Sequence, residues 1–249
     1  MSKIYLIGVA ISTLLLGGCA DISSSDIRTS GICADINVYN SNNRVKVDTT
    51  LTAGCGVGGS YVMLDGSDYL SANYLSSSYT LSKHTEFISN ITSYIATSSS
   101  NYSTGEQVSV ALNRDSGSVS ARNSFVNLPQ TFVMTQPVNN AVYTSGGTIN
   151  FSWDRVHSPS SVSLKLECNR SDGSSTIGSM QQASYGTFHQ ITVSEVYNRF
   201  SQPGAPALLS CSGTARVKQS QAGYIDPAYE SGSKITASYI QSRNISINF

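Results

Sequence analysis

The chain has 249 residues, of which only 12% are charged, and its formal net charge is zero. Intracellular domains usually carry about twice that share of charged residues, and a nucleic-acid partner would require a basic face. The composition therefore argues against nucleic acid as a partner and against electrostatic binding to anionic lipid. The polar positions are mostly serine, threonine, asparagine and glycine, which favour strands and turns over helices.

The chain begins with a short segment that has the layout of an export signal. Lys3 precedes an apolar stretch from Ile4 to Leu16, which is shorter than the about 20 residues that span a bilayer. The stretch ends in the run Leu16-Gly17-Gly18-Cys19, which resembles the lipobox of bacterial lipoproteins. The resemblance implies cleavage before Cys19 and acylation of its thiol and its new amino group. Acyl chains anchor a protein because each buried CH₂ contributes ~0.8 kcal/mol.

The alternatives for this segment are an ordinary secretory signal and a buried core strand. The position of Cys19 at the end of the apolar stretch favours the lipoprotein. By the same resemblance, Ala20 implies sorting to the outer membrane, although an aspartate follows it at Asp21. We therefore expect a signal peptide over residues 1–18, a flexible tether over 19–30, and a lipid-anchored protein that faces the periplasm or the cell exterior.

Residues 31–130 have the pattern of a first β-sandwich domain. Apolar residues alternate with polar ones over Ala34–Val38 and again from Val45, with a turn at Asn40–Asn43 between them, which predicts a hairpin with one buried face. Further strands are predicted near residues 61–64, 69–74, 107–112 and 118–126. The segment Phe87–Ala96 fits one face of a helix as well, but its β-branched residues favour a strand.

Residues 131–249, which follow Leu128-Pro129-Gln130, form the second predicted domain. The run from Pro137 to Trp153 resembles the first two strands of a fibronectin type III or related immunoglobulin-like domain. The resemblance implies that Trp153 seeds the core of this half, and about seven short strands match that expectation. The predicted fold is therefore all-β, with two antiparallel immunoglobulin-like β-sandwich domains.

Four cysteines remain besides Cys19, and an even number in an oxidising compartment predicts two disulfides: Cys33, Cys55, Cys168 and Cys211. Residue order alone leaves three pairings open. A structural metal site would normally show paired C-x-x-C spacing, which is missing here, so we expect no metal.

The pairing that we predict is local within each half. The turn after Cys33 folds the chain back and brings Cys55 to the same edge, and the immunoglobulin-like resemblance places Cys168 and Cys211 on neighbouring strands of one sheet. Neither bridge crosses residue 130, so each domain is expected to fold alone.

No motif in the sequence predicts catalysis, and we expect neither catalytic residues nor a cofactor. The run Gly54–Gly59 matches G-x-G-x-x-G, but a strand follows where a dinucleotide site needs a helix. The histidines His84, His157 and His189 are isolated, and Asp65 with Asp68 reads as a turn with too few donors for calcium. The sequence favours a non-enzyme and leaves open a triad that assembles only in space.

The longest irregular loop, residues 219–232, contains the candidate binding residues Tyr224, Asp226 and Tyr229. Exposed tyrosines among serine, glycine and asparagine suit the binding of proteins or sugars. We therefore expect a non-enzymatic binding, adhesion or assembly module, with the membrane and an envelope protein as its partners. The alternative is a carbohydrate-binding or carbohydrate-active envelope protein.

Overall fold

The computed structural model describes residues 21–56, 58–87, 90–115, 119–155 and 160–249. The predicted signal peptide and Cys19 lie outside the described residues. Within them the chain is almost entirely β-structure, with one α-helix and two short 3-10 turns, Ser24–Asp26 and Thr29–Gly31. The all-β prediction is thus confirmed.

The strands follow the chain in two groups. The first group is β1 (Ile22–Ser23), β2 (Ile32–Ser41), β3 (Arg44–Ala53), β4 (Val62–Met63), β5 (Tyr69–Tyr74), β6 (Ser77–Thr80), β7 (Ser82–Thr85), β8 (Thr92–Asn101), β9 (Gln107–Asn113) and β10 (Ala121–Asn127). The second group is β11 (Met134–Gln136), β12 (Ala141–Thr144), β13 (Thr148–Trp153), β14 (Ser160–Arg170), β15 (Ser175–Ser184), β16 (Phe188–Thr192), helix α1 (Val193–Phe200), β17 (Leu208–Ala222) and β18 (Lys234–Asn248).

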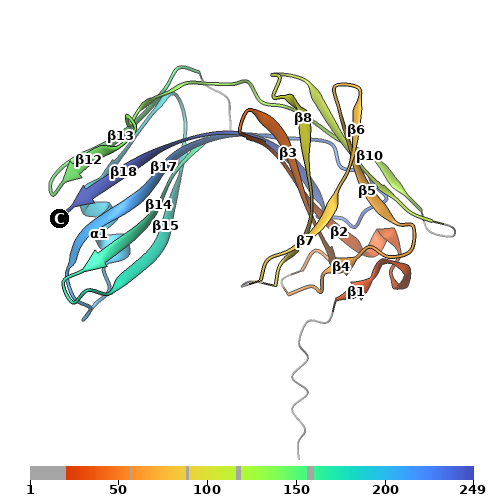
Figure 1. Cartoon of the computed structure of the whole chain (residues 1–249), viewed down its shortest axis with the longest axis horizontal. Helices are drawn as coiled ribbons and strands as arrows, with labels where there is room; N and C mark the ends of the chain where they lie inside the picture. The colour runs from red at the N-terminus through yellow and green to blue at the C-terminus, as the bar shows by residue number, and fades with distance from the viewer. Residues whose placement is uncertain (1–20, 57, 88–89, 116–118, 156–159) are drawn as a thin grey trace, which may run out of the picture.

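One large sheet runs through the whole molecule. Eight of its nine strands lie in the order β15-β14-β17-β18-β2-β3-β8-β7, and the ninth, β12, pairs with β18. A sheet of order β10-β9-β5-β6 faces it at one end, and a sheet of order β11-β13-β16 faces it at the other. Figure 1 shows the resulting pair of lobes, which are joined by the long strands β17 and β18.

Each lobe is a sandwich with its own hydrophobic core. In the first lobe the alternate residues Ile32, Ala34, Ile36 and Val38 of β2 are all fully buried, as the period-two pattern predicts. In the second lobe β13, β14 and β17 supply the core, and Trp153 is 3% exposed within it. Leu128 is buried in the first core and Phe132 in the second, so the chain passes from one core to the other near the predicted boundary at residue 130.

The last strand, β18, belongs to both lobes. One of its edges pairs along its length with β17. Its other edge pairs in parallel with β2 over Lys234–Ser238 and in parallel with β12 over residues 245–248. Tyr229, Ile235 and Ala237 are buried in the first core, although they follow the second lobe in sequence. Residues 31–130 alone would lack these side chains and one strand, which argues against the expectation that this half folds alone.

Both predicted disulfides are confirmed. Cys33 on β2 is bonded to Cys55, which follows β3, with their Cα atoms 5.0 Å apart. Cys168 on β14 stands directly opposite Cys211 on the neighbouring strand β17 and is bonded to it. The second bond is therefore a staple between adjacent strands of one sheet, as expected.

The tether prediction is wrong for residues 21–30, which fold onto the first lobe. Ile22 and Ser23 pair in parallel with β4, and the carboxylate of Asp65 accepts hydrogen bonds from the hydroxyls of Ser23, Ser24 and Ser25. The first of these bonds is the main reason why the pKa of Asp65 is lowered to about 2. Polar composition indicated a flexible segment, but these serines are hydrogen-bonding partners of a distant aspartate.

Arg114 also attaches the N-terminal segment to the first lobe. Its guanidinium donates to the carbonyl oxygens of Ser24 and Ile27 and to the hydroxyl of Thr29. It also forms an ion pair with Asp68, in which the side chains are 2% and 8% exposed. The start of the described chain is thus part of the first lobe.

Candidate binding surface

The face of the large sheet that turns away from both cores is polar and is shared by the two lobes. On β2 the residues between the buried ones are Asp35, Asn37 and Tyr39, and on β17 Arg216 and Lys218 occupy the same kind of position. Successive side chains of a strand point to opposite faces, so this alternation gathers polar groups from both lobes on one side. The surface is built by the topology, because β18 brings β2 and β17 into one sheet.

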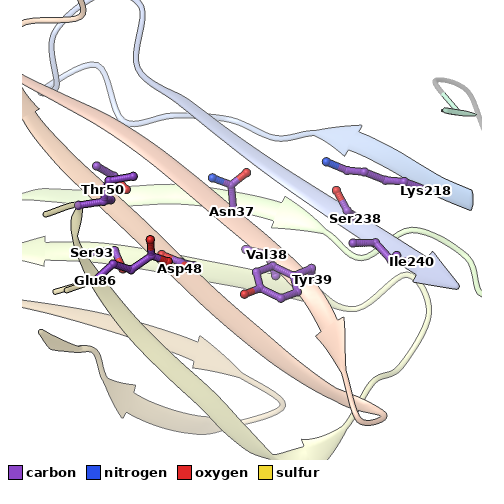
Figure 2. Close-up of a pocket in the computed structure, with 11 residues that line it drawn as sticks. Asn37, Val38, Tyr39, Asp48, Thr50, Glu86, Ser93, Lys218, Ser238 and Ile240 are labelled. Atoms are coloured by element: carbon purple, nitrogen blue, oxygen red, sulfur yellow. The ribbon is translucent and has the colours of Figure 1, made fainter. Parts of the chain in front are cut away.

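A hollow of about 370 Å³ lies on this face, where the two lobes meet. Figure 2 shows Asn37 and Tyr39 on β2, with Asp48 and Thr50 of β3 on one side and Ser238 and Ile240 of β18 on the other. The full lining is Asn37, Val38, Tyr39, Asp48, Thr50, Glu86, Ile91, Ser93, Lys218, Ser238 and Ile240. Lys218 stands opposite Ile240 in the β17–β18 pairing.

Hydrogen bonds and charges within and between neighbouring strands order this surface. The amide of Asn37 donates to the carboxylate of Asp35 at 3.0 Å, and Asp35 forms an exposed ion pair with Lys234 at 3.1 Å. The ammonium of Lys46 lies 5.6 Å from the centre of the Tyr39 ring, a cation–π contact. The result is an aromatic ring among amide, hydroxyl and charged groups, which suits a polar ligand or a polar protein segment.

Two of the three candidate residues in the predicted binding loop are buried. Asp226 is 5% exposed and Tyr229 is 4% exposed. The carboxylate of Asp226 accepts hydrogen bonds from the backbone N–H groups of Asn123 and Ala228, both at 2.8 Å, and burial raises the pKa of Tyr229. These two side chains fix the loop to the first lobe and are not available to a ligand.

Tyr224 is the third candidate residue of that loop, and it reaches the surface, with 49% of its area exposed. Its ring stacks on Phe125 of β10 with centroids 5.4 Å apart, and the two residues exchange backbone hydrogen bonds. The pair forms a small aromatic patch on the first lobe, and neither ring lines the hollow.

The histidines and the carboxylates singled out in the sequence are not gathered into one cluster within the described residues. They contain no group of three or more His, Cys, Asp or Glu side chains placed to hold a metal ion. Nε2 of His189 is hydrogen-bonded to the amide oxygen of Gln182 at 2.6 Å. His84 lies on the short strand β7, and His157 lies outside the described residues. Asp65 accepts hydrogen bonds from the N-terminal segment, and Asp68 pairs with Arg114, which donates to that segment.

Sequence reasoning did not find the hollow. Its walls come from β2, β3, β8, β17 and β18 and from Glu86 and Ile91 between β7 and β8, so no continuous motif encodes it. The available signal was the polar alternation of β2 and β17, which does not differ from that of any solvated sheet face.

Comparison with known proteins assigns no family, since neither a family model nor a curated protein matches the chain. Among solved structures, one chain of a cytokine receptor complex aligns over 86% of this chain and 95% of that chain, with 9% sequence identity and a TM-score of 0.28. So distant a likeness carries no argument, and the all-β architecture rests on the strands described above. In the described part of the chain, no helix is long and apolar enough to cross a membrane.

Proposed function

We propose that this chain is a lipid-anchored, non-enzymatic binding or assembly module of the bacterial envelope. The observation that carries the proposal is the polar face shared by both lobes, with its hollow around Tyr39. Rigid sandwiches commonly act as scaffolds that present a binding surface. The partner that we propose is another envelope protein.

The anchor that we propose is an acylated Cys19 at the outer membrane. Cys19 lies three positions before Ile22, which pairs with β4 of the first lobe. An acylated Cys19 would therefore hold the first lobe close to the lipid surface, with β1 and Asp65 at the near end.

Mass spectrometry of the N-terminal peptide from cells tests the anchor. The proposal predicts a peptide that begins at Cys19 and carries acyl chains, and predicts that Cys19→Ser releases the protein from membranes. A chain that begins elsewhere without lipid would contradict the anchor. Protease treatment of intact cells then distinguishes the periplasm from the cell exterior.

Purification of the native protein from detergent-solubilised membranes tests the partner. The proposal predicts a stoichiometric partner for the wild type and its loss for Tyr39→Ala, while the matched change Tyr185→Ala, at a residue 91% exposed and outside the hollow, keeps it. Recovery of the protein without a partner under gentle conditions would contradict the proposal.

A second candidate is a carbohydrate-binding protein. It is favoured by the Tyr39 ring beside amide and hydroxyl groups and by the exposed Phe125–Tyr224 stack, because aromatic rings with neighbouring polar groups suit sugars. Titration with envelope glycans separates the candidates. Binding that is lost in Tyr39→Ala or Tyr224→Ala supports this one, and no binding to any glycan contradicts it.

A further inference from the structure

The large sheet ends in a long strand whose outer edge is open. β15 runs for ten residues, Ser175–Ser184, and pairs with β14 along all ten without a register shift. No strand of the described chain pairs with its other edge. The backbone N–H and C=O groups on that edge form a ready template for another strand.

The sequence of β15 lacks the features that usually protect an edge. Its sequence, Ser-Thr-Ile-Gly-Ser-Met-Gln-Gln-Ala-Ser, has no charged residue and no proline, and its regular pairing excludes a bulge. At the opposite edge of the same sheet, β7 has only four residues and carries Lys83. Short length and lysine are the ordinary protections against edge-to-edge pairing, and β15 has neither.

The side chains of β15 would gain cover from a further strand. Ile177 is 69% exposed on the face away from the core. On the other face, Met180 is only partly buried against the second core, and Gly178 lies under the ring of Phe200 on α1. A neighbouring strand would extend the sheet past Met180 and close that end of the core.

We propose that β15 is a dimer interface, at which it pairs in antiparallel fashion with β15 of a second copy of this chain. A two-fold axis perpendicular to the sheet places like faces beside each other and makes the contact self-complementary. Because no residue of β15 is charged, no antiparallel register sets like charges opposite each other. Self-pairing through β7 would bring Lys83 near its own copy. This proposal does not rest on the function proposed above.

Cysteine cross-linking of the purified full chain tests the pairing and its direction. We choose three positions on one face of β15, Ser175→Cys, Ser179→Cys and Ala183→Cys, and the control Ser212→Cys on the same face of the interior strand β17. An antiparallel dimer predicts a reducible dimer band for Ser179→Cys near the strand centre and a much weaker one for each end position alone. A mixture of the Ser175→Cys and Ala183→Cys variants should again give a strong dimer band, because these two positions face each other in an antiparallel pair.

Several results would overturn the proposal. Equal cross-linking at all three β15 positions would mean parallel pairing, equal cross-linking at Ser212→Cys would mean random collision, and cross-linking only to another protein would mean a different occupant. Peptide mapping confirms that the native disulfides, Cys33–Cys55 and Cys168–Cys211, are intact in each variant.

A charge variant gives an independent measurement. Ser179→Lys should raise the dimer dissociation constant by roughly tenfold or more, because two lysines would meet at the two-fold axis, while Ser212→Lys should leave it unchanged. Sedimentation of the full chain in density-matched detergent measures both. A wild type that is monomeric at every concentration, or a Ser179→Lys variant that dimerises as the wild type does, would contradict the proposal.

Discussion

The rings of Tyr239 and Tyr102 lie 5.2 Å apart, centroid to centroid, at an angle of 57°. Tyr102 belongs to the first core, while the same Tyr239 ring also lies 5.2 Å from Phe132 of the second core. One side chain of β18 therefore packs against both lobes. Gln241, two residues further along the same face, donates to the carbonyl of Phe132. The junction is thus a packed contact and not a free linker.

Replacing Tyr239 by alanine should destabilise both lobes together. Truncation of a large aromatic residue in a core typically costs 3–5 kcal/mol, and for this partly buried ring we expect about 2–4 kcal/mol. Urea unfolding measures the loss, with the fluorescence of Trp153, the only tryptophan of the chain, reporting on the second lobe. Tyr185→Ala, at a residue 91% exposed, should change stability by less than about 0.5 kcal/mol. Equal effects of the two variants would mean that Tyr239 does not couple the cores.

The buried ion pair between Arg114 and Asp68 should matter far more than the exposed pair between Lys234 and Asp35. Asp68→Asn leaves the Arg114 charge buried without its partner, and we expect a loss of about 3–5 kcal/mol. Asp35→Asn removes a partner from a pair whose side chains are 63% and 42% exposed, and should cost less than about 1 kcal/mol. Urea denaturation of both variants compares them, and similar losses would contradict the role assigned to Arg114.

Asp65 should make the attachment of the N-terminal segment sensitive to acid. Its folded pKa of about 2 lies below the ordinary 3.8, so its contribution is fully present above pH 3.8 and is lost as the pH falls towards 2. Hydrogen exchange at the N–H of Ile22, which donates to the carbonyl of Tyr61 at 2.8 Å, reports on the attachment. We expect exchange to rise above its intrinsic pH dependence in this range for the wild type. In the Asp65→Asn variant the N-terminal segment should already be less firmly attached at neutral pH, and exchange at Ile22 should show no extra rise between pH 3.8 and 2.

The sequence predicted the local structure well, and failed where distant segments meet. Alternation around Asn40–Asn43 predicted the β2–β3 hairpin, and the cysteine pairing was correct. Alternating apolar and polar residues predict a strand but not the strand that pairs with it. The sequence therefore did not indicate that Lys234 of β18 would lie opposite Asp35 of β2. The buried state of Asp226 was equally hidden, because its hydrogen-bonding partner Asn123 lies 103 positions away.

Removing either disulfide should lower stability through the unfolded chain. The bridges close loops with sequence separations of 22 and 43 residues, for which chain entropy gives about 3 to 4 kcal/mol each. We expect paired Cys→Ser variants to unfold at lower urea concentration, with the Cys168–Cys211 variant affected slightly more. Variants as stable as the wild type would contradict this expectation.

Photo-cross-linking in intact cells tests most directly whether the shared polar face is the binding surface. A photoreactive residue in place of Ile240 lies in the hollow, and one in place of Leu75, which is 42% exposed at the β5–β6 turn, serves as the control. The account predicts a specific cross-link to an envelope partner from position 240, none from position 75, and loss of the cross-link when Tyr39→Ala is added. Equal labelling from both positions, or a cross-link that persists unchanged in Tyr39→Ala, would contradict it.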